Sequence, residues 1–191
     1  VNLEQIAKVR AARGRPGEAK DLLREAVDVA VRVYGDDHLE VARLRLSLGR
    51  ALVELQDTGA EATLGRCAAS LEDQLGADDW RPSIAHLWLG RHLADAGRLS
   101  EAAGLFESAR DRRRRTLEAG DARILEAELA ARWARTALGE TPAESAASLN
   151  ELHAELLEAQ GETSMVRWLG ERLENASRAS GASGYLDSPS L

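Results

Sequence analysis

The feature that most constrains this chain is an internal period of slightly more than 40 residues. Successive copies begin at a small residue, at Ala7, Gly49, Gly90 and Ala134, in steps of 42, 41 and 44 residues. In the third copy two further small residues, Ala102 and Ala109, follow Gly90 at 12 and 19 residues. Apolar residues around them fall at three- and four-residue steps, which predicts two amphipathic helices in close contact. A repeated helical pair predicts a stack of hairpins with a continuous core.

The other copies keep this spacing to different degrees. The first has alanine at both later small positions. The second has Glu61 at the first of them, so we expect Ala60 or Ala62 to pack there instead. The fourth departs at the last position, where His153 stands.

This pattern, with a large apolar residue directly before the first small one, resembles the tetratricopeptide repeat. The steps exceed that family's usual period of about 34 residues. The junctions VYGDDHLEVA (33–42) and QLGADDWRPSIA (74–85) are similar to those of the longer, kinesin-light-chain-like subtype, which also occurs in large bacterial signalling proteins. The resemblance covers roughly Leu3 to Gln160 and departs from the subtype at Leu39, where proline is usual.

The resemblance implies an all-α fold, a tetratricopeptide-like α-solenoid of about four helical hairpins with a C-terminal capping helix. We place this domain at residues 1–176 and a disordered Ser/Gly-rich tail at 177–191. The expected repeats are 1–36, 37–78, 79–121 and 122–161, followed by the cap at 162–176. A capping box, Thr141 to Glu144, is expected to open the eighth helix. A helix begins at Val1 without a methionine or a cap, so we expect a piece of a longer polypeptide.

Composition and charge argue against several partners. The chain has 32 acidic and 25 basic residues, a net charge of -7, which disfavours bulk attraction to nucleic acid or to anionic membranes. No run approaches the roughly 18 apolar residues of a membrane span, and no secretory leader is visible. We therefore expect a soluble, cytoplasmic protein.

Residues that could carry chemistry do not cluster in the sequence. The four histidines, His38, His86, His92 and His153, lack the spacing of metal ligands. Cys67 lies beside a packing position, so we expect a buried, inert thiol. No phosphate-binding loop or nucleophile motif is present. We expect no enzyme activity, no metal and no cofactor.

A row of cations follows the first small position of each copy: Lys8, Arg50, Arg91 and Arg135. On a helix this position points about 100° away from the packing position. The resemblance implies that the row lines a concave groove that binds peptides, and we predict that the groove also contains Arg43, Ile84 and, as an anchor, Trp88. Cations in such a groove favour an acidic peptide or a terminal carboxylate.

An alternative interpretation makes these cations part of ordinary helix ion pairs. Glu54 and Asp95 lie four residues after Arg50 and Arg91, whereas both ends of the row lack a carboxylate at that offset. The run Arg112 to Arg115 is similarly expected to be a solvated extension of the sixth helix, with a docking site for an acidic partner domain as the alternative. Trp133 and Trp168 are expected in the core.

The favoured function is a non-catalytic protein–protein interaction scaffold that binds a partner peptide or domain in the basic groove. By resemblance, it would regulate or recruit an attached domain of a bacterial signalling protein, for example a Ser/Thr kinase. The alternatives are a self-assembly or obligate-subunit scaffold and, least favoured, an enzyme domain. We expect a monomer or weak self-association. A further hypothesis places the tail, with Tyr185, Leu186, Asp187 and the carboxylate of Leu191, in its own or a neighbour's groove.

Overall fold

The regular structure of the chain is entirely α-helical over the residues described, 2–140 and 145–183, in this computed structural model. The helices are α1 (Leu3–Ala12), α2 (Pro16–Tyr34), α3 (Leu39–Glu54), α4 (Ala60–Leu75), α5 (Pro82–Asp95), α6 (Leu99–Thr116), α7 (Ala122–Ala137), α8 (Ser145–Gln160) and α9 (Ser164–Ser183). The predicted all-α fold is confirmed.

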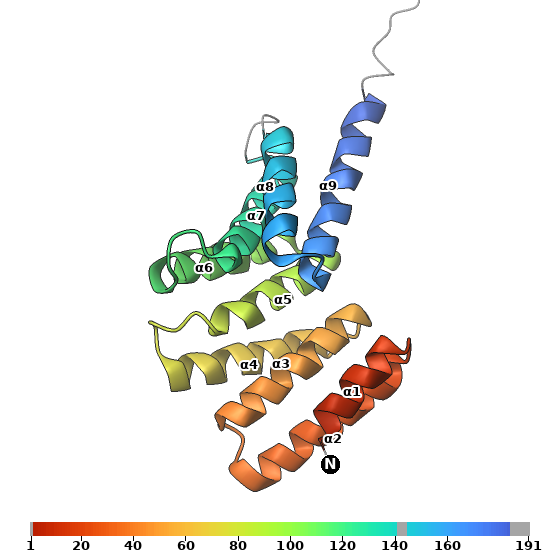
Figure 1. Cartoon of the computed structure of the whole chain (residues 1–191), viewed down its shortest axis with the longest axis vertical. Coiled ribbons are helices and arrows are strands. Elements are labelled where there is room, and N and C mark those ends of the chain that lie inside the picture. Colours follow the sequence, from red (N-terminus) through yellow and green to blue (C-terminus); the bar gives the residue numbers. More distant parts are fainter. Residues whose placement is uncertain (1, 141–144, 184–191) are drawn as a thin grey trace, which may run out of the picture.

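The helices form successive antiparallel hairpins along the long axis of the molecule (Figure 1). Each helix packs on the next one in the chain, and α3 also contacts α5. The last helix, α9, packs on both α7 and α8. This is the contact expected of a helix that covers the end of a hairpin stack, because an isolated repeat face is apolar. None of the described helices is both long enough and apolar enough to span a bilayer.

Glycine allows the closest approach within two of the hairpins. A Cβ atom added to Gly90 on α5 would lie 2.5 Å from Cε1 of Phe106 on α6. A Cβ on Gly49 of α3 would likewise lie 2.4 Å from Cδ2 of Leu64 on α4. Both distances are far below van der Waals contact, so these positions exclude larger residues. Small residues therefore set the helix spacing, as the period indicated.

The second and fourth hairpins are each one residue out of register with the other two. Ala60 is fully buried and Glu61 is exposed, so the expected replacement of Glu61 by Ala60 is confirmed. In the fourth hairpin Leu149 is buried. His153, which stands at the last small position of this copy, faces α9. There the imidazole Nε2 lies 3.0 Å from the carbonyl oxygen of Val166.

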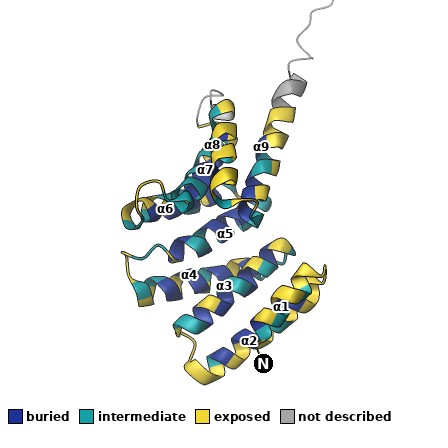
Figure 2. Cartoon of the chain, in the orientation of Figure 1, coloured by how far each residue is buried: buried dark blue, intermediate teal, exposed yellow. Residues whose placement is uncertain are grey.

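Burial is concentrated on the faces between neighbouring helices (Figure 2). One apolar cluster runs from Ala7 on α1 to Leu173 on α9, which gives the stack its continuous core. Phe106, Trp133 and Trp168 meet within it, with ring centroids 5.0 to 6.5 Å apart. Trp133 and Trp168 thus pack in the core as predicted.

The C-terminal helix is longer than the sequence suggested. We placed the end of the cap at residue 176, but α9 continues to Ser183. An ion pair one turn apart, Arg178 with Glu174 at 3.2 Å, supports this extension, and the alanines within it favour helix. The predicted capping box at 141–144 and the tail residues 184–191 lie outside the described residues, and so does the hypothesis about the tail.

Candidate protein-binding surfaces

Three of the predicted groove residues, Arg50, Ile84 and Trp88, line one hollow, which we call the central hollow. Its volume is about 240 Å³, and α3, α5, α6, α7 and the start of α9 contribute to its walls. The other residues that matter below are Trp80, Arg113, Arg123 and Glu126. The central hollow thus joins residues that lie more than 70 positions apart in the sequence.

Arg50 lies over the face of Trp88, with its Cζ atom 4.9 Å from the ring centroid. Trp88 is buried, so its indole forms a fixed platform, and a cation over such a face is stabilised by the ring's electrons. Arg50 itself is exposed and makes no ion pair with any residue the structure describes. Its hydrogen-bond donors remain available to an anion.

Arg91 follows Trp88 on α5 but has a different role. Its side chain is buried, and its two terminal nitrogens donate to the carboxylate of Glu54 on α3. It also donates to the backbone carbonyl of Ser164 at 3.3 Å, at the start of α9. Near it, the indole N–H of Trp168 donates to Asp95 at 2.8 Å. Arg91 therefore ties α9 onto α3 and α5.

The far wall of the central hollow contains a buried arginine that sequence reasoning placed in solvent. Arg113 donates to Ser83 Oγ at 2.8 Å, to the carbonyl oxygen of Arg123 and to Glu126 at 2.8 Å. Burial lowers the pKa of its guanidinium, opposed by the charge of Glu126. Beside it, Arg123 stacks on Trp80, with Cζ 4.1 Å from the ring centroid. The wall is therefore cationic and aromatic.

The expectation that Arg112 to Arg115 form a solvated extension is wrong for its first two residues. Arg112 bridges to α4, where it donates to Glu72 at 2.8 Å and to the carbonyl oxygen of Gly76 at 3.1 Å. Arg113 is buried as described. Arg114 remains exposed and pairs with Glu128 on α7 at 2.7 Å. The cause is tertiary, since α4, α5 and α7 surround the end of α6.

The ends of the predicted cation row have carboxylate partners that helix spacing alone did not indicate. Lys8 is largely exposed and pairs with Glu4 at 3.3 Å, one turn earlier rather than later. Arg135 pairs with Glu107 on the neighbouring helix α6. Neither residue lines the central hollow. The structure thus brings together the middle of the row and not its ends.

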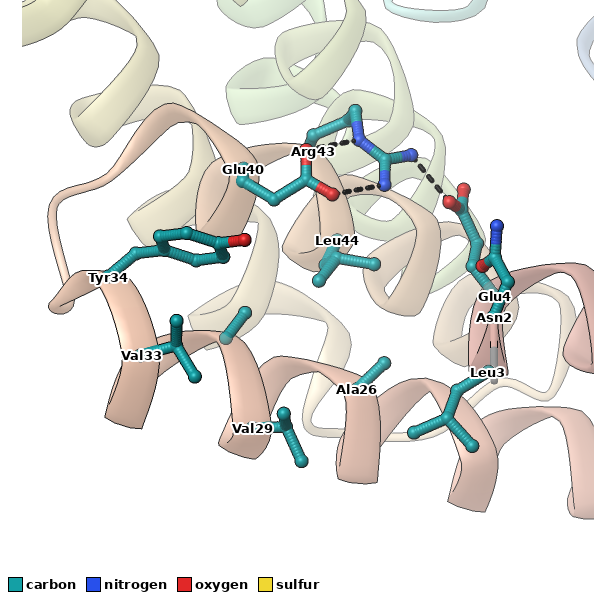
Figure 3. A pocket seen from close by; sticks show the side chains of 11 residues that line it. Asn2, Leu3, Glu4, Ala26, Val29, Val33, Tyr34, Glu40, Arg43 and Leu44 are labelled. Carbon is teal, nitrogen blue, oxygen red and sulfur yellow. Dashed lines mark hydrogen bonds and ion pairs between the residues drawn. The ribbon is translucent and has the colours of Figure 1, made fainter.

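Arg43 lines a separate cleft of about 340 Å³ between α1, α2 and α3 (Figure 3). It donates to Glu40 at 2.6 Å and to Glu4 at 2.5 Å. Burial opposes ionisation of Glu4, but the hydrogen bonds from Arg43 and Ser47 outweigh it and lower the pKa of that carboxyl. The two carboxylates thereby balance the positive charge of the Arg43 guanidinium. The opposite side of the cleft is apolar and includes Val33 and Tyr34, which are exposed.

The other side chains that could take part in chemistry are held in structural contacts. Cys67 is buried as predicted, its thiol donates to the carbonyl oxygen of Ala42 at 3.2 Å, and burial raises its pKa to about 12. Burial also lowers the pKa of His86, although Glu72 lies 3.7 Å away. In the described part of the chain, no three or more histidine, cysteine, aspartate or glutamate side chains group together to hold a metal ion.

A comparison with models of protein families agrees with the stacked helical hairpins described above. The model described as Tetratricopeptide repeat matches residues 1–73, which span α1 to α3 and nearly all of α4. The matched part of the chain therefore consists of tetratricopeptide repeats. Tetratricopeptide repeats act as protein-interaction scaffolds, and this coarse function is what the match supports. No curated protein matches the sequence.

Solved tetratricopeptide repeat structures extend the likeness to nearly the whole chain. Two crystal structures of a Podosopora anserina protein, described as a kinesin light chain with nearly identical TPR-like repeats, are 19% identical, with TM-scores of 0.69 and 0.66. Each alignment covers 94% of this chain, and 85% and 86% of the other. BtubC (BKLC) from P. vanneervenii is 15% identical, with a TM-score of 0.67, over 99% of this chain and 66% of that chain. At these identities the likeness establishes the fold, and the predicted solenoid of the kinesin-light-chain-like type is confirmed.

Proposed function

We propose that this protein binds an acidic peptide or domain of a partner protein at the central hollow, and that it has no catalytic role. The observation that carries the proposal is the unpaired guanidinium of Arg50 on the Trp88 platform. Arginine binds carboxylates through two parallel hydrogen bonds, and a partly enclosed site strengthens them. An aromatic platform fixes the guanidinium at little entropic cost.

The other walls support the same ligand chemistry. Three guanidinium groups, from Arg50, Arg113 and Arg123, face one carboxylate, from Glu126. Because Arg113 is held by Glu126 and Arg123 is held by Asp121 at 2.5 Å, we assign direct ligand contact to Arg50. Ile84 and Trp88 supply apolar surface next to it. The segment that fits best has an acidic residue next to an apolar one.

The test is a titration of the protein with a labelled acidic peptide that contains one aromatic residue. Arg50→Glu should weaken binding about tenfold or more, since it places a like charge at the contact. Arg115→Glu is the matched control, because Arg115 is exposed on α6, does not line the central hollow and makes no ion pair with described residues. Equal affinity of both variants would overturn the proposal. Binding to the parent protein should weaken as salt increases.

Self-assembly is the second candidate function, and one specific observation favours it. The cleft of Figure 3 exposes Val29, Val33 and Tyr34 on one face of α2. Exposed apolar residues that gather in this way are typical of protein interfaces. Mass measurement over a range of protein concentration tests this function. A dimer that Val33→Asp dissociates would support it, whereas a concentration-independent monomer would exclude it.

We further propose, from the resemblance in sequence, a cytoplasmic location and an attachment to a larger bacterial signalling polypeptide, such as a Ser/Thr kinase. In that arrangement, occupation of the central hollow would regulate or recruit the attached domain. The measurement is the activity of the complete polypeptide with and without the acidic peptide. The peptide is used at a concentration that saturates the parent but not Arg50→Glu. If the activity of the parent polypeptide stays unchanged at that concentration, the regulatory part of the proposal is contradicted.

A further inference from the structure

A second hollow lies between α2 and α4, with α3 as its floor, and we call it the α2–α4 hollow. Its volume is about 720 Å³, against about 240 Å³ for the central hollow. Leu48 of α3 forms part of its floor and stands two residues before Arg50. At about 100° per residue, those two side chains leave α3 in nearly opposite directions. The α2–α4 hollow is therefore a different surface from the central hollow.

The α2–α4 hollow carries an excess of positive charge at its rim. Arg32 and Arg66 line it, are exposed and make no ion pair with any residue in the described ranges. Arg24 has only a distant partner, Asp21, at 3.9 Å. A fourth arginine of the lining, Arg45, is fully engaged by Asp36. Three weakly paired or unpaired guanidinium groups thus face a single remaining lining carboxylate, from Asp28.

The equivalent seam between α4 and α6 shows what usually closes such a gap. There Arg98 pairs with Glu61 at 2.7 Å and Arg112 pairs with Glu72 at 2.8 Å. Glu72 stands eight residues after Leu64, the residue that packs on Gly49. The equivalent residue on α2, eight after Leu23, is Val31.

Between α2 and α4 the valine replaces the bridging carboxylate. The pair of Lys20 with Asp57, at 3.2 Å, bridges α2 only to the turn before α4. Within the described residues, no ion pair joins the remainder of the two helices. The apolar side chains of Val27, Val31 and Leu48 consequently stay at the bottom of the hollow. A cationic rim over an apolar floor is the result.

We propose that the α2–α4 hollow binds an acidic segment of a partner polypeptide that inserts apolar side chains between α2 and α4. Charge complementarity selects the partner, because guanidinium groups at the rim bind carboxylates and exclude cationic segments. The apolar floor supplies affinity through burial of the inserted side chains. This site goes beyond the function assigned to the central hollow, and it would let one repeat array hold two partners at once.

Methyl NMR of the whole chain tests the site directly. The probe is a short synthetic peptide of glutamate and leucine, with leucines at three- and four-residue steps, and the matched peptide has lysine in place of glutamate. The acidic peptide should shift the methyl signals of Val27, Val31 and Leu48, and the basic peptide should not. Ile84 and Leu87 report on the central hollow in the same spectra. Shifts confined to those two residues, or equal shifts with both peptides, would overturn the proposal.

A charge-matched pair of variants gives the second test. Arg32→Glu with Arg66→Glu should weaken binding of the acidic peptide about tenfold or more. Arg13→Glu with Arg115→Glu changes the net charge equally on exposed sites elsewhere. Ala62→Glu adds a carboxylate at the exposed rim without removing an arginine and should also weaken binding. Equal losses in both double variants, or a loss with Arg50→Glu alone, would refute the site and leave the central hollow untouched.

Discussion

Arg91 on α5 binds both carboxylate oxygens of Glu54 on α3, at 3.0 and 3.2 Å. Helix spacing had offered Arg50, four residues before Glu54, as the local partner. Since Arg91 takes the carboxylate, Arg50 rests on Trp88 and keeps its donors free. One inter-helix ion pair therefore both fixes the stack and leaves a cation for a ligand.

Removal of Arg91 should destabilise the protein more than removal of Arg50. Arg91→Met loses charge-assisted hydrogen bonds to Glu54 and the contact to Ser164, and we expect a cost of about 2 kcal/mol. Arg50→Met changes an exposed residue without an ion pair in the described part, with an expected effect of about 0.5 kcal/mol or less. Urea unfolding measures both. Equal costs would mean that the Arg91 contact does not stabilise the stack.

Gly90 should not tolerate alanine, because a Cβ there meets Phe106 at 2.5 Å. Gly90→Ala should cost about 1–3 kcal/mol through overpacking. Gly104 on α6 is the matched control, since a Cβ there meets nothing within 4 Å. Gly104→Ala should stabilise α6 by about 0.5–1 kcal/mol, because alanine restricts the unfolded chain. Thermal unfolding of the two variants should therefore shift in opposite directions, and a shift in the same direction would contradict the packing argument.

Asp121 should contribute to stability in a pH-dependent way. It caps α7 by accepting from the backbone N–H of Arg123 at 2.9 Å, and hydrogen bonds from the Arg123 side chain lower its pKa to about 2. The folded pKa lies below the usual value, so the stabilisation is present above about pH 4 and is lost as the pH falls toward 2. Asp121→Ala should cost about 1 kcal/mol near neutral pH.

Asp121→Asn separates the cap from the charge. The amide oxygen can still accept the cap hydrogen bond, but it does not titrate. The difference in free energy of unfolding between the parent and this variant should shrink as the pH falls from 5 to 2. Asp73→Asn, on the exposed surface of α4, is the control. A difference that stays constant over this range would mean that the charge of Asp121 is not involved.

The sequence predicted the helices well because their ends depend on local signals. α4 begins at Ala60 and ends at Leu75, since a glycine-containing turn precedes it and Gly76, with φ of 74°, follows it. The partners of the arginines were predicted less well. Spacing along a helix offers neighbours four residues away, but Arg91 and Arg135 find theirs on other helices. Those choices depend on how hairpins stack.

One wall of the central hollow was predictable from the repeat period. Arg50, Ile84 and Trp88 lie on the first helices of their hairpins, α3 and α5, which the period identifies. The opposite wall, with Trp80 and Arg123, comes from a loop and a later repeat, and no spacing rule joins those residues. Arg113 could have been found by its repeat position. It stands 23 residues after Gly90, as Ala30 does after Ala7, and Ala30 is buried.

Arg113 places a buried charge where the first hairpin has the apolar residue Ala30, and this leads to a prediction about stability. Arg113→Met should cost about 3 kcal/mol, because Glu126 is largely buried and loses its partner at 2.8 Å. The double variant with Glu126→Gln should recover part of this loss, since no unpaired charge remains. A double-mutant cycle should give a coupling of about 1 kcal/mol or more. Arg115→Met, on the exposed side of α6, should change stability by about 0.5 kcal/mol or less. If the two single changes add without coupling, Arg113 stabilises the repeat through its contacts to Ser83 and the backbone and not through its charge.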